Sequence, residues 1–174
     1  MNKVVEIKNL VKRYDDNFQL GELSLDIPAG EIIGLIGENG AGKTTLIKSI
    51  LDILIINKGE IKIFGKNLKN KEINIKEDIG VVLDNSFFPE VMTAKDINSI
   101  MQSIYKTWDS KLYYDYLEKF NIPIISSIKK LSKGMKKKLE IATALAHKPK
   151  LLILDEPTSG LDPVVRNEVL DIFL

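Results

Sequence analysis

The sequence contains no cysteine, so disulfide bonds and thiolate metal sites are excluded. It also lacks a long apolar run: stretches such as residues 50–56 are short and interrupted, whereas a bilayer span needs about 20 residues. Residues 1–6 show no apolar run between a basic head and a small-residue cleavage site, which predicts that there is no signal peptide. We therefore expect a soluble cytosolic domain that reaches a membrane only through a partner.

Charge of one sign is lacking too. Lysine and arginine number 25 against 24 acidic residues, so the net charge gives no reason to expect a nucleic acid as partner. A chain of 174 residues has the length of one domain and can bury a substantial core.

Apolar patterns predict the strands. Alternation at Val5 and Ile7, and again over residues 23–27, predicts half-exposed strands in an antiparallel layer. The continuous apolar runs at residues 32–36 and 151–154 predict strands buried on both faces. Further strands are predicted at residues 60–64 and 79–83.

Helical periodicity fills the remaining segments. A helix is predicted over residues 43–54, another after the cap pair Thr93 and Asp96, and a third that includes residues 112–120. A fourth predicted helix carries an apolar stripe of Met135, Leu139, Ala142 and Ala146. The whole pattern predicts one α/β domain over residues 1–174: a core with a mostly parallel sheet, an N-terminal antiparallel layer and a helical insertion at roughly 87–147.

A glycine-rich segment carries the first chemical signal. Residues 37–44 match G-x-x-x-x-G-K-[ST] and lie between a predicted strand and a predicted helix, the context of a phosphate-binding loop rather than a chance surface turn. Lys43 can reach the β- and γ-phosphates of ATP, and the Thr44 hydroxyl can ligate Mg²⁺, so the core is expected to be that of a P-loop NTPase. The residues expected to bind nucleotide here are Gly37, Glu38, Asn39, Gly40, Ala41, Gly42, Lys43, Thr44 and Thr45.

Two carboxylates follow the apolar run 151–154. Asp155 and Glu156 directly follow this predicted strand and so lie at its carboxyl end. Ligands collect at the carboxyl ends of strands in open α/β sheets. Asp155 can hold Mg²⁺ through water, and Glu156 can orient or deprotonate the attacking water as the catalytic residue.

Two further segments resemble a known family. Residues 131–139 resemble the signature motif of the ABC ATPases, and residues 155–163 look like that family's Walker B and D-loop run. The resemblance covers essentially the whole chain and implies an ATP-hydrolysing motor subunit of a transporter. It implies that two such subunits, identical or different, pack head to tail, and that separate integral membrane subunits hold them at the inner face of the cell membrane. The signature residues Ser132, Lys133, Gly134 and Met135 would then contact ATP bound by the partner, and Asp162 belongs to the D-loop.

The chain departs from the family's commoner pattern at two places. Lys133 to Met135 stand where Gly-Gly-Gln is usual, which resembles subunits of small bacterial exporters. Asp84 stands where a glutamine usually senses Mg²⁺; it can still accept a hydrogen bond from metal-bound water, and the alternative is a solvated loop acid. The resemblance also implies that Tyr14 stacks on adenine, the alternative being an amphipathic surface tyrosine.

A run of lysines and a single histidine need an interpretation as well. The lysines at 129, 130, 133, 136, 137 and 138 lack interleaved aromatics, so a solvated helix face that adds positive potential near ATP explains them better than a nucleic-acid site. His147 is predicted to lie at a helix end, where a cation suits the dipole.

The resemblance also bears on the end of the sequence. The family continues past the D-loop to another strand and a switch histidine, whereas here the pattern of Val165, Val169 and Ile172 stops at Leu174. We expect a fragment of a longer subunit, with ATP hydrolysis by the whole subunit and weak or no turnover by this piece.

Three functional classes remain at this point. The first is a transporter motor, the second a soluble relative acting on ribosomes or nucleic acid, and the third a nucleotide-binding module without turnover. The short insertion between the phosphate loop and Asp155 favours the first over the second, and Glu156 argues against the third.

Overall fold

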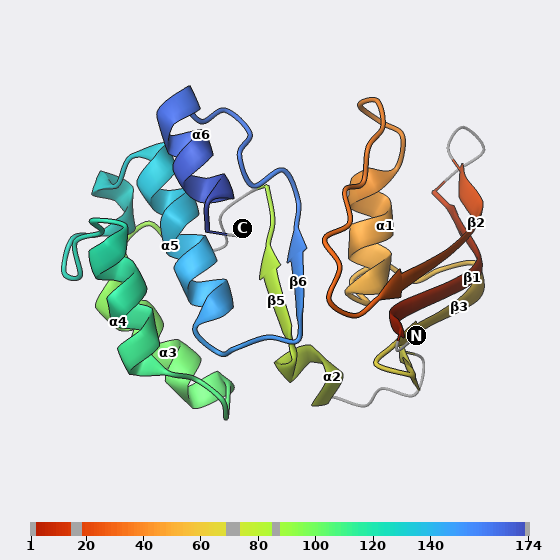
Figure 1. Cartoon of the computed structure of the whole chain (residues 1–174), viewed down its shortest axis with the longest axis horizontal. Coiled ribbons are helices and arrows are strands. Elements are labelled where there is room, and N and C mark those ends of the chain that lie inside the picture. The colour runs from red at the N-terminus through yellow and green to blue at the C-terminus, as the bar shows by residue number, and fades with distance from the viewer. Residues whose placement is uncertain (1–2, 15–18, 69–73, 85–87, 173–174) are drawn as a thin grey trace. The chain divides into compact units, whose positions relative to one another are not determined.

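The computed structural model describes residues 3–14, 19–68, 74–84 and 88–172. The chain divides into two compact units, Met1–Lys76 and Glu77–Leu174, and each is described by itself (Figure 1). The strands are β1 (Lys3–Arg13), β2 (Gln19–Pro28), β3 (Lys58–Ile63), β4 (Lys66–Asn67), β5 (Ile79–Val82) and β6 (Leu151–Leu154). The helices are α1 (Lys43–Ile50), α2 (Asn74–Glu77), α3 (Ala94–Ile104), α4 (Ser110–Lys119), the short 3₁₀ helix η2 (Ile128–Lys130), α5 (Lys133–Leu145) and α6 (Pro163–Leu170).

The first unit contains an antiparallel sheet in the order β2-β1-β3-β4. Ile7 in β1 lies opposite Leu25 of β2 and Ile61 of β3, and Ile7 and Ile61 are buried. The alternation of apolar and polar residues places one side-chain face of the sheet in the core. The predicted N-terminal antiparallel layer is confirmed.

The segment before the phosphate loop departs from the prediction. Residues 31–38 form no strand, and Ile32 and Ile36 are 78% and 96% exposed, so the predicted doubly buried strand at 32–36 is wrong for this structure. A strand requires a neighbour to pair with its backbone groups. In the described residues the four strands of this unit pair only with one another, and none pairs with this segment.

Helix α1 begins at Lys43 as predicted and ends at Ile50, earlier than the predicted residue 54. Asp52 has a φ of 56°, in the left-handed region, and the N–H groups of Ile53 and Leu54 both donate to the Lys48 carbonyl at 2.9 and 3.2 Å. A left-handed residue with backward hydrogen bonds to the last turn ends a helix. The apolar residues that follow therefore leave the helical axis.

The second unit contains a parallel pair of strands. Residues of β5 and β6 lie opposite one another from Ile79 and Leu151 to Val82 and Leu154. β6 was predicted to be buried on both faces, and this is wrong, because every residue of β6 is only partly buried. Among the described strands β6 pairs with β5 alone, so one of its edges forms no sheet hydrogen bonds with a described strand.

The predicted start of α3 is confirmed in detail. The Thr93 hydroxyl accepts a hydrogen bond from the Asp96 N–H at 3.2 Å, and the Asp96 carboxylate accepts one from the Thr93 N–H at 2.9 Å. This reciprocal pair is a capping box. The hydrogen bonds from Thr93 lower the pKa of Asp96 below its ordinary value.

Helix α5 has two buried faces and organises the second unit. One face packs with α4 in a cluster that includes Leu139, Ala142, Ala146, Tyr113, Leu117 and Phe120, as the apolar stripes predicted. The other face packs with β5 and α6 in a cluster that contains Ile141, Ala144, Val82 and Val169. Figure 1 shows α5 between the helices α3 and α4 and the two strands. The helices α3 to α5 fall within the predicted insertion 87–147, whose extent stays a prediction.

None of the helices in the described residues is both long and apolar enough to cross a bilayer.

Candidate functional site

The phosphate loop, residues 37–44, is shaped by glycines. Gly40 and Gly42 have φ values of 85° and 94°, in the left-handed region of backbone conformation that residues other than glycine rarely adopt. The Ala41 N–H donates to the Glu38 carbonyl at 3.2 Å, which closes the turn. Gly42 caps α1 and, as a glycine, supplies no side-chain acceptor to the first turn of the helix. The N-terminal amides of α1 therefore keep their positive end for a ligand anion.

Lys43 folds back over this loop. Its Nζ donates to the carbonyl oxygens of Gly37 and Glu38 at 2.7 and 2.8 Å. In the described part of the chain no carboxylate forms an ion pair with it, so its charge is held at the loop by neutral groups alone. That places a cation where the sequence predicts phosphate oxygens.

The structure brings Tyr14 to the same helix. The Tyr14 hydroxyl lies 3.3 Å from the Thr45 hydroxyl, and the ring is about half exposed. The Lys12 ammonium lies 5.2 Å from the ring centroid and also donates to the Ile55 carbonyl at 2.8 Å. Lys12 was not among the predicted site residues, although a cation two positions before an aromatic on one strand face was a usable signal.

The carboxylates after β6 have different environments. Asp155 is 6% exposed, and its backbone N–H donates to the Val82 carbonyl of β5 at 2.8 Å. Glu156 is exposed and has a φ of 48°, in the left-handed region. Such strained backbone occurs at functional sites because surrounding structure holds it there. The buried acid is thus fixed by the sheet, and the exposed one by a turn.

The signature turn, residues 131–135, packs against the D-loop within the second unit. The Ser132 hydroxyl accepts the Met135 N–H at 3.2 Å and so caps α5, as predicted. A Cβ at Gly134 would lie 2.9 Å from the Val165 Cγ1 of α6, which leaves this glycine no room for a side chain. The Lys133 side chain similarly fills the space beside Gly160.

Asp162 completes this arrangement by capping α6. Its carboxylate accepts hydrogen bonds from the N–H groups of Val164 and Val165, both at 3.1 Å. The signature turn and the D-loop therefore meet at the N-termini of two helices, whose positive ends favour anions.

One lysine departs from the predicted solvated face. Lys137 is 5% exposed, lies 2.9 Å from the Glu140 carboxylate, and donates to the carbonyls of Leu83 and Asp84 at 2.8 and 3.4 Å. Its long side chain crosses from α5 to the end of β5. The prediction is therefore wrong for Lys137, while Lys136 and Lys138 form ion pairs with Glu90 and Glu168. Glu140 was missed, although its i, i+3 spacing from Lys137 was visible in the sequence.

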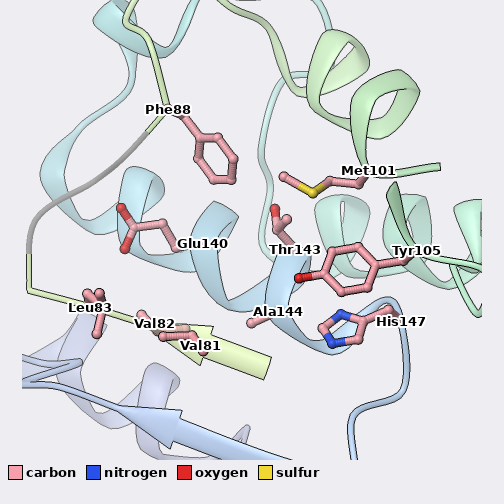
Figure 2. Close-up of a pocket in the computed structure, with 10 residues that line it drawn as sticks. All are labelled: Val81, Val82, Leu83, Phe88, Met101, Tyr105, Glu140, Thr143, Ala144 and His147. Carbon is pink, nitrogen blue, oxygen red and sulfur yellow. The ribbon is translucent and has the colours of Figure 1, made fainter. Parts of the chain in front are cut away.

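A cavity of about 170 Å³ lies beside this pair (Figure 2). It is lined by Val81, Val82, Leu83, Phe88, Met101, Tyr105, Glu140, Thr143, Ala144 and His147. Figure 2 shows Glu140 near one end and Tyr105 with His147 near the other.

His147 is buried at the end of this cavity rather than exposed as a helix-end cation. It is 2% exposed, its ring stacks on Tyr105 at a centroid distance of 4.2 Å, and its Nε2 lies 3.2 Å from the Ile79 carbonyl oxygen. Burial lowers the pKa of His147 below its ordinary value, and burial raises the pKa of Tyr105. The prediction of a cation suited to the helix dipole is therefore wrong, because burial favours the neutral ring.

In the described ranges of the chain, no group of three or more His, Cys, Asp or Glu side chains could hold a metal ion by itself. Mg²⁺ is usually held by one or two carboxylates together with substrate phosphates, and the assignment of Thr44, Asp155 and Asp84 to such a site stays a prediction. The phosphate loop lies in the first unit and the two acids in the second, and their convergence stays a prediction.

Comparisons with known proteins bear on the family. The chain is 34% identical over 171 residues to the ABC transporter ATP-binding protein YtrB of Bacillus subtilis, covering 98% of this chain and 58% of that protein. It is 34% identical to the bacitracin transport ATP-binding protein BcrA of Enterococcus faecalis, covering 97% of this chain and 56% of that protein. The chain thus spans little more than half the length of these curated relatives.

Solved structures of ABC transporter proteins have a similar fold. A structure described as the ATP binding subunit of an ABC transporter aligns with a TM-score of 0.86 at 28% identity, covering 98% of this chain and 73% of that one. The cbiO1 protein of Clostridium perfringens, described as part of the ABC transporter complex cbiONQ, aligns with a TM-score of 0.78 at 27% identity, covering 99% of this chain and 73% of that one.

The family itself follows from the extent of the match. Residues 20–159, which include the phosphate loop, the signature turn, Asp155 and Glu156, match the family described as ABC transporter. The relatives above are ATP-binding proteins, and their similarity extends over nearly all of this chain. The chain therefore belongs to the ABC transporter family, among its ATP-binding subunits.

Proposed function

We propose that this chain forms the ATP-binding part of the motor of an ABC transporter, whose whole subunit hydrolyses ATP together with a second ATP-binding subunit and drives separate membrane subunits. The observation that supports this most strongly is the phosphate loop: Gly40 and Gly42 turn the backbone, α1 begins without a side-chain cap, and Lys43 is held over the loop. These features together suit a polyphosphate ligand.

Binding would use the first unit. The loop amides and Lys43 contact the β- and γ-phosphates, Thr44 contacts Mg²⁺, and Tyr14 lies beside Thr45 to stack on the adenine. Bound Mg²⁺ supplies positive charge that offsets the charge of the phosphate oxygens.

Hydrolysis would use residues of the second unit. Asp155, fixed at the end of β6, would hold Mg²⁺ through water, and the exposed Glu156 would accept the proton of the attacking water as a general base. Ser132 and Gly134 of a second subunit contact the γ-phosphate, because the N-terminus of α5 attracts an anion. Closure of the two subunits around ATP, and opening after hydrolysis, would drive the integral membrane subunits that hold this peripheral pair at the inner face of the cell membrane.

The test compares Glu156→Gln with Glu118→Gln, an exposed glutamate on α4, in the complete protein. Glu156→Gln should lower phosphate release by about 10²–10⁴-fold, the usual effect of losing a positioned base. It should still bind MgATP and should sediment as a dimer when MgATP is present. Glu118→Gln should match the wild-type protein in each measurement.

Two results would contradict the proposal. Unchanged phosphate release in Glu156→Gln would remove its catalytic role. A monomer at concentrations well above saturation with MgATP would argue against an ATP site shared by two subunits.

A further inference from the structure

A buried ion pair on α5 lies outside the residues assigned to ATP above. Lys137 and Glu140 are 5% and 9% exposed, and the Lys137 Nζ lies 2.9 Å from the Glu140 Oε2. Removing two charges from water is costly, and the attraction between them compensates only when further hydrogen bonds satisfy both groups. The partners of the lysine therefore indicate what the pair does.

The remaining partners of Lys137 belong to another element. An ammonium group has three N–H donors. The Lys137 Nζ forms an ion pair with Glu140 and donates hydrogen bonds to the carbonyls of Leu83 and Asp84, at 2.8 and 3.4 Å. Both carbonyls lie just beyond β5, whose last residue is Val82. The Lys137 side chain thus connects α5, the helix that begins in the signature turn, to the backbone at Leu83 and Asp84.

The connection begins where the sheet hydrogen bonds end. The Val82 carbonyl accepts the Asp155 N–H at 2.8 Å, and the next two carbonyls of the chain accept from Lys137. Glu140 and Leu83 line the same cavity, and Figure 2 shows both at the end away from Tyr105 and His147. The lysine therefore continues the backbone anchoring by two residues past the last paired residue of β5.

We propose that Lys137 and Glu140 form a buried clamp that positions Asp84 next to the carboxylates at the end of β6. The two are positioning residues: the clamp acts on the backbone carbonyls, and Asp84 would accept a hydrogen bond from water bound to Mg²⁺. This role rests on the proposed function, in which the chain binds MgATP, and on the predicted Mg²⁺ role of Asp84. It also joins the signature helix to that contact through one side chain.

A purely structural pair predicts a different behaviour from a clamp. Lys137→Met leaves the Glu140 carboxylate buried without its cation, so it should lower the thermal midpoint of unfolding. The double variant Lys137→Met/Glu140→Leu removes both charges and should recover the midpoint, since apolar replacement of a buried ion pair is often neutral. The double variant still lacks donors for the Leu83 and Asp84 carbonyls, so stability and positioning separate.

The first measurement is amide hydrogen exchange at Leu83 and Asp84, followed by NMR in the whole chain. Exchange at these two amides should accelerate about tenfold in Lys137→Met and in the double variant, because the backbone segment that Lys137 holds by its carbonyls opens more readily without those hydrogen bonds. The matched control is Lys136→Met, which removes the adjacent lysine of α5 and its ion pair with Glu90. The control should leave exchange at both amides unchanged.

The second measurement is the affinity for ATP by calorimetry, with Mg²⁺ and with EDTA. The double variant should bind MgATP about tenfold more weakly, again the effect of one lost charge-assisted contact. Its affinity for ATP in EDTA should stay at the wild-type value, since the phosphate loop is untouched. Asp84→Asn should weaken MgATP binding to a similar extent without changing exchange at Leu83.

The outcomes separate the clamp from the proposed function. Wild-type exchange at both amides in the double variant would overturn the clamp, whatever the affinities. Accelerated exchange with unchanged MgATP affinity would overturn its role in positioning Asp84. A wild-type chain that binds no ATP in either condition would overturn the proposed function and the Mg²⁺ role, while the exchange rates would still decide whether the clamp exists.

Discussion

The phosphate loop and the signature turn are both predicted to bind phosphate, but they are built in different ways. The phosphate loop is exposed from Gly37 to Ala41, and its shape depends on left-handed glycines and one lysine held by backbone carbonyls. The signature turn is capped by Ser132 and packs directly on α6 at Gly134. One uses backbone conformation, and the other uses side-chain packing.

The difference concerns where each site gains its order. An exposed loop with uncapped amides offers its donors to a ligand and gains contacts when the ligand binds. A turn supported by a core has its geometry set by folding. We therefore expect ligand binding to be most sensitive at the phosphate loop, and folding to be most sensitive beneath the signature turn.

Among variants that test the folding of the second unit, Leu117→Ala should cause the largest loss of stability. Leu117 is fully buried in the cluster shared by α4 and α5, and truncating a buried leucine costs about 2–5 kcal/mol of unfolding free energy. Leu170→Ala, at a leucine that is 41% exposed, is the control and should cost much less. Urea unfolding gives both values. Equal losses would show that the second unit does not depend on this cluster.

A smaller effect is expected at Gly134, directly at the turn. Gly134→Ala places a methyl group 2.9 Å from the Val165 side chain, and overpacking of this kind costs about 1–3 kcal/mol. Adding Val165→Ala should recover most of that loss in thermal unfolding. Gly34→Ala meets no atom within 4 Å and should have little effect. A loss that persists in the double variant would mean that the contact with Val165 is not the cause.

The smallest effect should be a dependence of unfolding stability on pH that comes from His147 in the second unit. The folded pKa of His147 is lowered, so the unfolded chain binds this proton more readily and acid favours unfolding. The contribution is complete above about pH 6.5, the ordinary histidine value, and is lost as the pH falls through the lower folded value. The midpoint temperature of thermal unfolding should therefore fall less on acidification in His147→Phe than in the wild type. Identical pH profiles would contradict a neutral buried ring.

Features set by neighbours in sequence were predicted well. The capping box of Thr93 and Asp96, the Ser132 cap and the apolar stripe of α5 depend on residues three or four positions apart, so a short window contains the whole interaction. The glycine pattern of the phosphate loop is local in the same sense. The start of α1 at Lys43 followed from it.

Features set by distant neighbours were predicted poorly. The apolar runs at 32–36 and 151–154 look alike in sequence, but burial depends on which strands lie beside them, and a short apolar run does not contain that information. Lys137 looked like its exposed neighbours because its partners at Leu83 and Asp84 lie more than fifty positions away. His147 was similarly misassigned, because Tyr105 and Ile79 bury it from other elements.

The most direct test of the central claim is the affinity for MgATP measured by calorimetry for Lys43→Ala and Lys48→Ala. Both lysines lie on α1, but only Lys43 folds over the phosphate loop. Lys43→Ala should weaken MgATP binding by about 10²-fold or more, since it removes charge-assisted contacts to two phosphates. Lys48→Ala should bind as the wild type does. Equal affinity in Lys43→Ala and the wild type would contradict the assignment of this loop as the ATP site.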